Sequence, residues 1–88
     1  MVNRLRISGS SVVSVDDTFK LIIEPWAEEF VVGPKEEYIL HATEYSAPGE
    51  FCITHIEDAV VVWLEFPQPV NCEVWRNGQL IFESCSPM

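Results

Sequence analysis

The feature that most constrains the fold is the way Gly and Pro interrupt short runs of β-branched and aromatic residues. The runs RLRIS, TFKLIIE, EFVV and AVVVWLEF stop at Gly9, Pro25, Gly33 and Pro67. Short runs of this composition, bounded by turn residues, are typical of β-strands. The sequence therefore predicts an all-β fold, a small antiparallel meander, sandwich or barrel of about 7–9 short strands. Residues 1–88 are expected to form a single domain around one modest core.

The most specific local prediction comes from the stretch VNCEVWRNGQLIFES. Asn77-Gly78 between alternating apolar residues is typical of a type I′ hairpin turn, because both central residues of that turn need a positive φ. Cys85 would then lie diagonal to Cys72, about 7–8 Å away, which is too far for an unstrained disulfide. The turn predicts the facing pairs Arg76–Gln79, Trp75–Leu80, Val74–Ile81, Glu73–Phe82 and Cys72–Glu83.

The segment after Gly33 is compatible with two structures. Pro34 near a first helical position, followed by Glu36 and Glu37, is typical of a helix start. An α+β fold with one short helix near residues 35–45 is therefore the alternative. The run Tyr38-Ile39-Leu40 and the neighbouring strands favour a strand in this place instead.

The charge balance excludes two classes of partner. Fourteen Asp and Glu residues against five Lys and Arg residues give a formal net charge of −9. Nucleic-acid binding needs a basic surface that neutralises phosphates, and an anionic membrane surface repels an acidic chain. A basic protein, by contrast, is attracted by this charge, and added salt screens the attraction.

The N-terminal stretch MVNRLRISGS lacks the apolar segment of a signal peptide, and no run approaches the ~20 apolar residues of a membrane span. Cys52, Cys72 and Cys85 are an odd number of cysteines without metal-ligand spacing. We therefore expect a cytoplasmic protein whose thiols are reduced.

Both histidines lie in HATEYSAPGEFCITHIED, residues 41–58, which we interpret as two strands of one hairpin. A two-residue turn at Pro48-Gly49 places His41 and His55 on opposite faces, whereas a three-residue loop places them opposite each other with Glu57 on the same face. In the second register His41, His55 and Glu57 are candidate metal ligands. The alternative is that each histidine is a half-buried sheet residue bonded to a neighbour.

Other catalytic chemistry finds no support in the sequence. The four acidic doublets lie next to expected turns, and adjacent strand residues point to opposite faces, so a doublet is not an acid–base pair by itself. Neither a glycine-rich phosphate loop nor a nucleophile elbow is present. We assign no catalytic residue, expect no cofactor and do not expect an enzyme.

The three tryptophans lie beside acidic residues, a composition that suits an interface receiving Arg or Lys. The run AVVVWLEF, residues 59–66, is apolar on both faces and is predicted to be an interior strand that needs cover on both faces. The alternative role of these large aromatics is to fill the core. The candidate partner-binding residues are Trp26, Glu28, Glu29, Trp63, Glu65, Glu73 and Trp75.

The stretches EPWAEEF and GPKEEYIL resemble a segment of small, uncharacterised bacterial β-proteins. The resemblance covers about a quarter of the chain. It implies a bacterial source and a strand rather than a helix in this region, and it implies no activity.

Three functions follow as hypotheses. The first is an acidic interaction module that binds a basic protein, for example as an inhibitor or immunity-type protein that blocks the phosphate groove of a cationic nuclease. The second is a structural homo-oligomer without a separate activity, built by pairing strand edges or apolar faces. The third is a small-ligand or metal-binding β-barrel centred on His41, His55 and Glu57.

Overall fold

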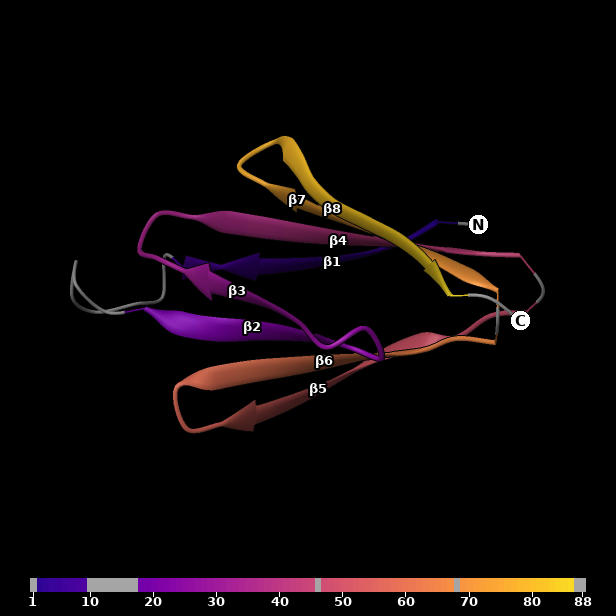
Figure 1. The fold of residues 1–88 in the computed structure, drawn as a ribbon, viewed down its shortest axis with the longest axis horizontal. Coiled ribbons are helices and arrows are strands. Elements are labelled where there is room, and N and C mark those ends of the chain that lie inside the picture. The colour runs from indigo at the N-terminus through magenta and orange to yellow at the C-terminus, as the bar shows by residue number, and fades with distance from the viewer. Residues whose placement is uncertain (1, 10–17, 46, 68, 87–88) are drawn as a thin grey trace.

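The computed structural model of the protein describes residues 2–9, 18–45, 47–67 and 69–86. These residues form two four-stranded sheets that stack face to face as a sandwich (Figure 1). Sheet I has the order β1-β4-β7-β8, and sheet II has the order β3-β2-β6-β5. The strands are β1 (Val2–Ser8), β2 (Phe19–Glu24), β3 (Glu28–Val32), β4 (Glu37–Glu44), β5 (Glu50–Ile56), β6 (Ala59–Glu65), β7 (Val70–Arg76) and β8 (Gln79–Ser86).

The all-β prediction is confirmed, and the sandwich is the member of the predicted set that the chain adopts. No α-helix occurs in the described ranges, and residues 37–44 form β4, so the alternative of a short helix near residues 35–45 is wrong. β4 pairs with β1 on one side and with β7 on the other. These two neighbours satisfy its backbone and hold this segment in the extended form. The run SVVSV, residues 11–15, which its β-branched composition also predicts to be a strand, lies outside the described residues.

One strand pair departs from the predicted antiparallel arrangement. β2 and β6 pair in parallel, with Leu21 beside Val60 and Ile23 beside Val62, whereas the other described pairs are antiparallel. Between β2 and β6 the chain leaves sheet II, forms β4 in sheet I and returns through β5. This excursion lets β6 enter sheet II in the same direction as β2.

The core lies between the two sheets and follows the alternation of the strands. In β6 the alternate residues Val62 and Leu64 are buried, and in β4 the alternate residues Leu40 and Ala42 are buried. β3 packs over β8 through the rings of Phe30 and Phe82, whose centroids are 6.1 Å apart. Each fully buried aliphatic side chain contributes roughly 1.5–3 kcal/mol to folding. β6, predicted as an interior strand, lies between β2 and β5.

The Asn77-Gly78 turn is confirmed, because φ is 49° at Asn77 and 84° at Gly78. The register beyond it is only partly as predicted. Arg76 faces Gln79 and Trp75 faces Leu80, but a β-bulge at Ile81 then shifts the pairing by one residue. The bulge makes the last three predicted pairs wrong, since the observed pairs are Val74–Phe82, Glu73–Glu83 and Cys72–Ser84.

The predicted hairpin between residues 41–45 and 51–57 is wrong. β4 belongs to sheet I and β5 to sheet II, where β5 pairs with β6 instead. Both sides of β4 are already occupied, so β5 has no free edge of β4 to pair with. The two proposed registers of this hairpin therefore do not occur.

Candidate interaction surface

The three candidate metal ligands lie in separate places. His41 is on the outer face of sheet I, where its Nδ1 lies 3.6 Å from Glu73 Oε1. His55 is on β5 in sheet II, at the cleft between that strand and β1, and Glu57 is in the turn between β5 and β6. Within the described part of the chain, no group of three or more His, Cys, Asp or Glu residues is placed to hold a metal ion. The geometry therefore gives the metal hypothesis no support.

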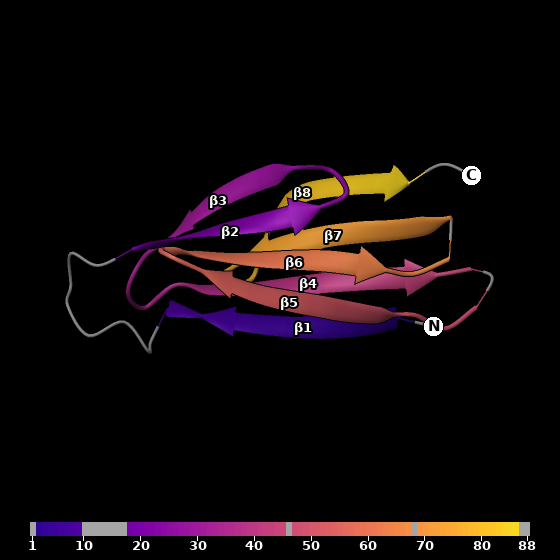
Figure 2. The same cartoon turned by 90° about the horizontal axis from the view of Figure 1, so that it is seen from below.

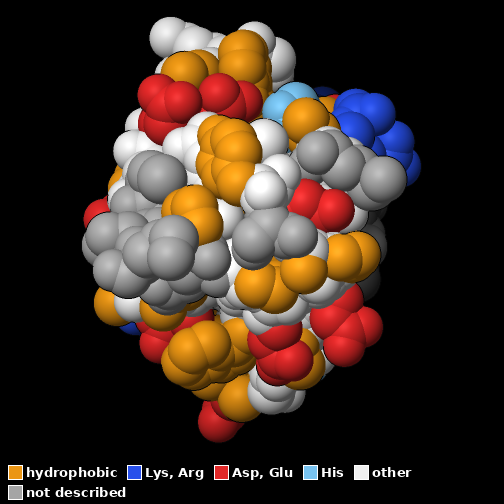
Figure 3. Space-filling model, turned by 90° about the vertical axis from the view of Figure 1, so that its right-hand side faces the viewer, with side chains coloured by type: hydrophobic (Ala, Val, Ile, Leu, Met, Phe, Trp, Pro, Cys, Tyr) orange, Lys and Arg blue, Asp and Glu red, His pale blue; other side chains and the backbone are white. Residues whose placement is uncertain are grey.

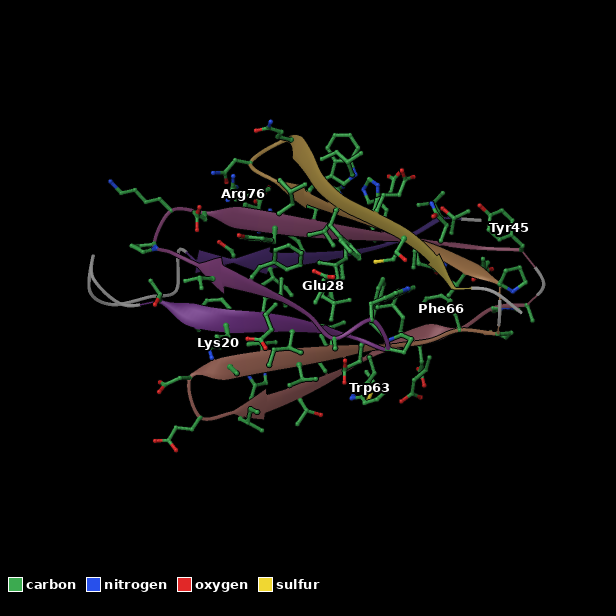
Figure 4. The ribbon with its side chains drawn as sticks, in the orientation of Figure 1. Lys20, Glu28, Tyr45, Trp63, Phe66 and Arg76 are labelled. Atoms are coloured by element: carbon green, nitrogen blue, oxygen red, sulfur yellow. The ribbon has the colours of Figure 1, made fainter. Side chains whose placement is uncertain are left out.

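The candidate partner-binding residues do not form one surface. Trp26 is partly buried and packs against the core. Glu28 is paired with the buried Ile23 and lies between the two sheets (Figure 4). The other candidates divide between the outer faces: Glu73 and Trp75 on sheet I, and Glu29, Trp63 and Glu65 on sheet II.

On the outer face of sheet I the acidic and aromatic residues are engaged with one another. Trp75 Nε1 donates a hydrogen bond of 3.1 Å to Glu73 Oε1, and the rings of Trp75 and His41 are 6.2 Å apart. Arg6 Nη1 lies 3.6 Å from Glu37 Oε2 on the same sheet. Positive and negative groups are mixed on this face, so it offers no continuous acidic surface.

On the outer face of sheet II, Trp63 is surrounded by carboxylates. Trp63 is 44% exposed, and its side chain points away from sheet I (Figure 4). Strand pairing places Glu24 beside it on β2, while Glu65 follows it on the same face of β6. Glu50 on β5 is the partner of Glu65. We call these four residues, Trp63, Glu24, Glu50 and Glu65, the Trp63 patch.

Within this patch two like charges face each other directly. Glu50 and Glu65 are cross-strand partners at exposed positions. Like charges in this arrangement destabilise a sheet by roughly 0.2–1 kcal/mol. Cys52 is the cross-strand partner of Trp63, and its thiol is close to these two carboxylates. The charge of Glu65, its hydrogen bond with the thiol, desolvation and then the charge of Glu50 raise the pKa of Cys52 above its ordinary value.

Glu24 adds an unsatisfied group to the patch. Its Oε1 atom is buried and has no hydrogen-bond partner among the described residues. Such an oxygen costs desolvation energy without compensation. The three carboxylates around Trp63 therefore make an arrangement that does not stabilise the isolated chain.

Positive charge is scarce around the patch. Lys20 is on the same face, but its Nζ lies 3.8 Å from Glu29 Oε1. Arg4 and Arg6 are on β1 in sheet I. Figure 3 shows red carboxylates around orange hydrophobic side chains in its lower part, where β5 and β6 lie, and most blue side chains at the upper right. The two sheets thus differ in the charge they present.

The sequence identified only part of this patch. The pattern of a tryptophan with acidic neighbours predicts Trp63 and Glu65 as partner-binding residues, but it does not predict Glu24 or Glu50. Glu24 and Glu50 join them through pairing between β6 and its two neighbours. A correct pairing of β5 with β6 across the short turn at residues 57–58 would have identified Glu50, whereas Glu24 is 39 residues away from Trp63 in the chain.

Comparisons of the chain with protein-family models, curated proteins and solved structures find nothing that matches it. The described residues also lack a helix long and apolar enough to cross a membrane. The Trp63 patch is therefore interpreted from its own chemistry.

Proposed function

We propose that the protein is an acidic interaction module that binds a basic protein through the Trp63 patch. The observation that carries this proposal is the half-exposed Trp63 indole, surrounded by Glu24, Glu50 and Glu65. An Arg or Lys of a partner can lie over the face of an indole, an interaction worth about 0.5–2 kcal/mol, while its charged group bonds to a carboxylate. An aromatic anchor with charged neighbours is the usual composition of an energetically dominant interface residue.

Relief of repulsion adds to the favourable contacts. The Glu50–Glu65 pair is unfavourable in the free chain and becomes favourable when a cation lies between the two carboxylates. The gain on binding thus includes the energy that the free chain loses to this repulsion. A concrete form of the function is an inhibitor or immunity-type protein that covers the phosphate groove of a cationic enzyme. We place it in the bacterial cytoplasm, where its thiols stay reduced.

Self-association through the same face is the second candidate. Val31, Ile56 and Trp63 are exposed on sheet II, and a second copy would bury apolar surface there. Two copies of this face, however, bring like carboxylates together, and each chain carries a net charge of −9. We therefore favour a basic partner.

The test is affinity capture at low and high salt with matched variants. The wild-type protein should retain a basic protein that added salt releases, and Trp63→Ala and Glu65→Lys should lose it. Trp75→Ala on the outer face of sheet I is the control and should retain it. If all four proteins retain the same basic partner, the Trp63 patch is not the binding surface, and the proposal fails.

A further inference from the structure

β5 is an edge strand of sheet II that no second described strand pairs with. Among the described strands it pairs only with β6, so every second residue turns its N–H and C=O groups outward without a strand partner. Proteins normally protect edges with Lys, Pro, bulges or short length. β3 has only five residues, β8 carries a bulge, and β1 carries Arg4 and Arg6. β5 has seven residues, an unbroken register with β6, and neither Lys nor Pro.

A cleft lies along the inner side of β5. β1 and β5 run along the same side of the sandwich (Figure 2). Between them lies a cavity of about 460 Å³, lined mainly by apolar side chains. Its volume falls in the range of pockets that hold small organic ligands. The lining residues that a neighbouring strand would meet first are Leu5, Ile7, Ile53 and His55, with Phe19 and Val60 deeper along β2 and β6.

The outer side of β5 lies on the same face of sheet II as the Trp63 patch. Glu50, Cys52 and Thr54 alternate there, and Glu65 and Trp63 lie one strand further in. Neighbouring strands are about 4.8 Å apart. A long basic side chain on a strand beside β5 can therefore reach Glu50 directly and approach Glu65 across it.

We propose that β5 binds an extended segment of the partner, in which apolar and basic residues alternate, as a fifth strand of sheet II. Main-chain hydrogen bonds hold the added strand, its apolar side chains enter the cleft beside β1, and its basic side chains meet Glu50 and Glu65. This inference rests on the proposed function, because it uses the same carboxylates. Charge complementarity selects the occupant: a second copy paired along β5 would bring two acidic faces together.

The experiment uses three synthetic peptides and the full chain. The first peptide alternates Val and Arg over about eight residues, a usual strand length. The second has the same composition with the Val and Arg residues in separate blocks, and the third is the first with alternate amides N-methylated. Affinity is measured by fluorescence anisotropy, and the site is mapped from amide shifts and hydrogen exchange by NMR.

We expect the alternating peptide to bind at least tenfold more tightly than both controls and to slow hydrogen exchange along β5. Ile53→Lys, which places a charge at the mouth of the cleft, should weaken this peptide about tenfold. Val31→Lys is the matched control, because Val31 is an equally apolar, exposed residue at the far edge of sheet II. It should leave the affinity unchanged.

The outcomes separate this inference from the proposed function. If the three peptides bind equally well and Glu65→Lys weakens all of them, the patch binds basic segments without strand addition, and the inference alone fails. If no peptide binds even at low salt, both fail. A concentration-dependent mass that Ile53→Lys abolishes would assign the edge to a second copy and would also overturn the inference.

Discussion

Glu65→Lys should make the free protein more stable while it removes binding. Glu50 and Glu65 are direct cross-strand partners on the solvent face, where Cβ atoms are about 5 Å apart. Two unit charges at roughly this distance in water interact by about 0.8 kcal/mol. Replacing one carboxylate by an ammonium turns repulsion into attraction, so the change is about twice this value. Twice the range of roughly 0.2–1 kcal/mol for a cross-strand pair gives about 0.4–2 kcal/mol.

The assay is urea denaturation at low and high salt. For a chain of this size, a slope of about 1 kcal/mol per molar urea converts this gain into an increase of the midpoint by about 0.4–2 M. High salt should reduce the increase, because it screens exposed charges. Glu57→Lys is the control, because it changes the net charge equally at an exposed turn position without a facing carboxylate.

Equal stability of Glu65→Lys and Glu57→Lys would contradict this prediction. In that case the Glu50–Glu65 pair carries no local repulsion. The Cys52 thiol supplies an independent check, because Glu65 is the main cause of its raised pKa. Glu65→Lys should lower this pKa, so that iodoacetamide modifies Cys52 faster at a given pH than in the wild type.

Three further predictions concern stability, each measured by urea denaturation. Burial raises the pKa of Cys72 from 9.0 to about 12. The unfolded chain therefore releases this proton at a lower pH than the folded chain, and the free energy of unfolding should fall between these two pH values by up to about 1.4 kcal/mol per pH unit. The same fall in Cys72→Ala would contradict this. Asn77→Ala should lower the free energy of unfolding by about 1–2 kcal/mol, because Asn77 has a φ of 49° and its Oδ1 accepts a 2.8 Å hydrogen bond from Glu37 N. Asn77→Asp should cost less, because it keeps an oxygen that can accept this bond. Gly49→Ala should lower the free energy of unfolding by about 1–3 kcal/mol, because the added Cβ would lie 2.5 Å from the Glu65 carbonyl oxygen. Full stability of this variant would contradict this prediction.

Local features could be predicted wherever the physical cause lies in neighbouring residues. The stop of β2 before Pro25 and the turn at Asn77-Gly78 depend on the φ angles that those residues allow. The alternation in residues 59–66 separates Val62 and Leu64 from Trp63 and Glu65, because successive side chains point to opposite faces. The sequence predicts cover for both faces, but in the structure Trp63 and Glu65 are exposed. The bulge at Ile81 had no local signal, and it changed three of the five predicted pairs.

The choice of partner strands was not determined locally. The sequence predicts one hairpin for the two histidines because their strands are consecutive, yet β4 pairs with β1 and β7, which are far away in the sequence. Pairing of β7 with β4 places Glu73 and Trp75 in sheet I, away from Trp63. Pairing of β2 with β6 places Glu24 next to Trp63. Several strands of this chain have similar composition, so their local preferences do not distinguish one partner from another.

The sequence by itself determined that this chain forms short strands, where several of them end, and that it carries a large negative charge. These properties depend on backbone preferences and on composition, which the tertiary structure does not change. The tertiary structure alone decided that Glu24, Glu50 and Glu65 would lie around Trp63 and that β5 would be an edge among the described strands of sheet II. Both results come from the order of strands in sheet II, which is set by how the two apolar faces pack over the whole chain.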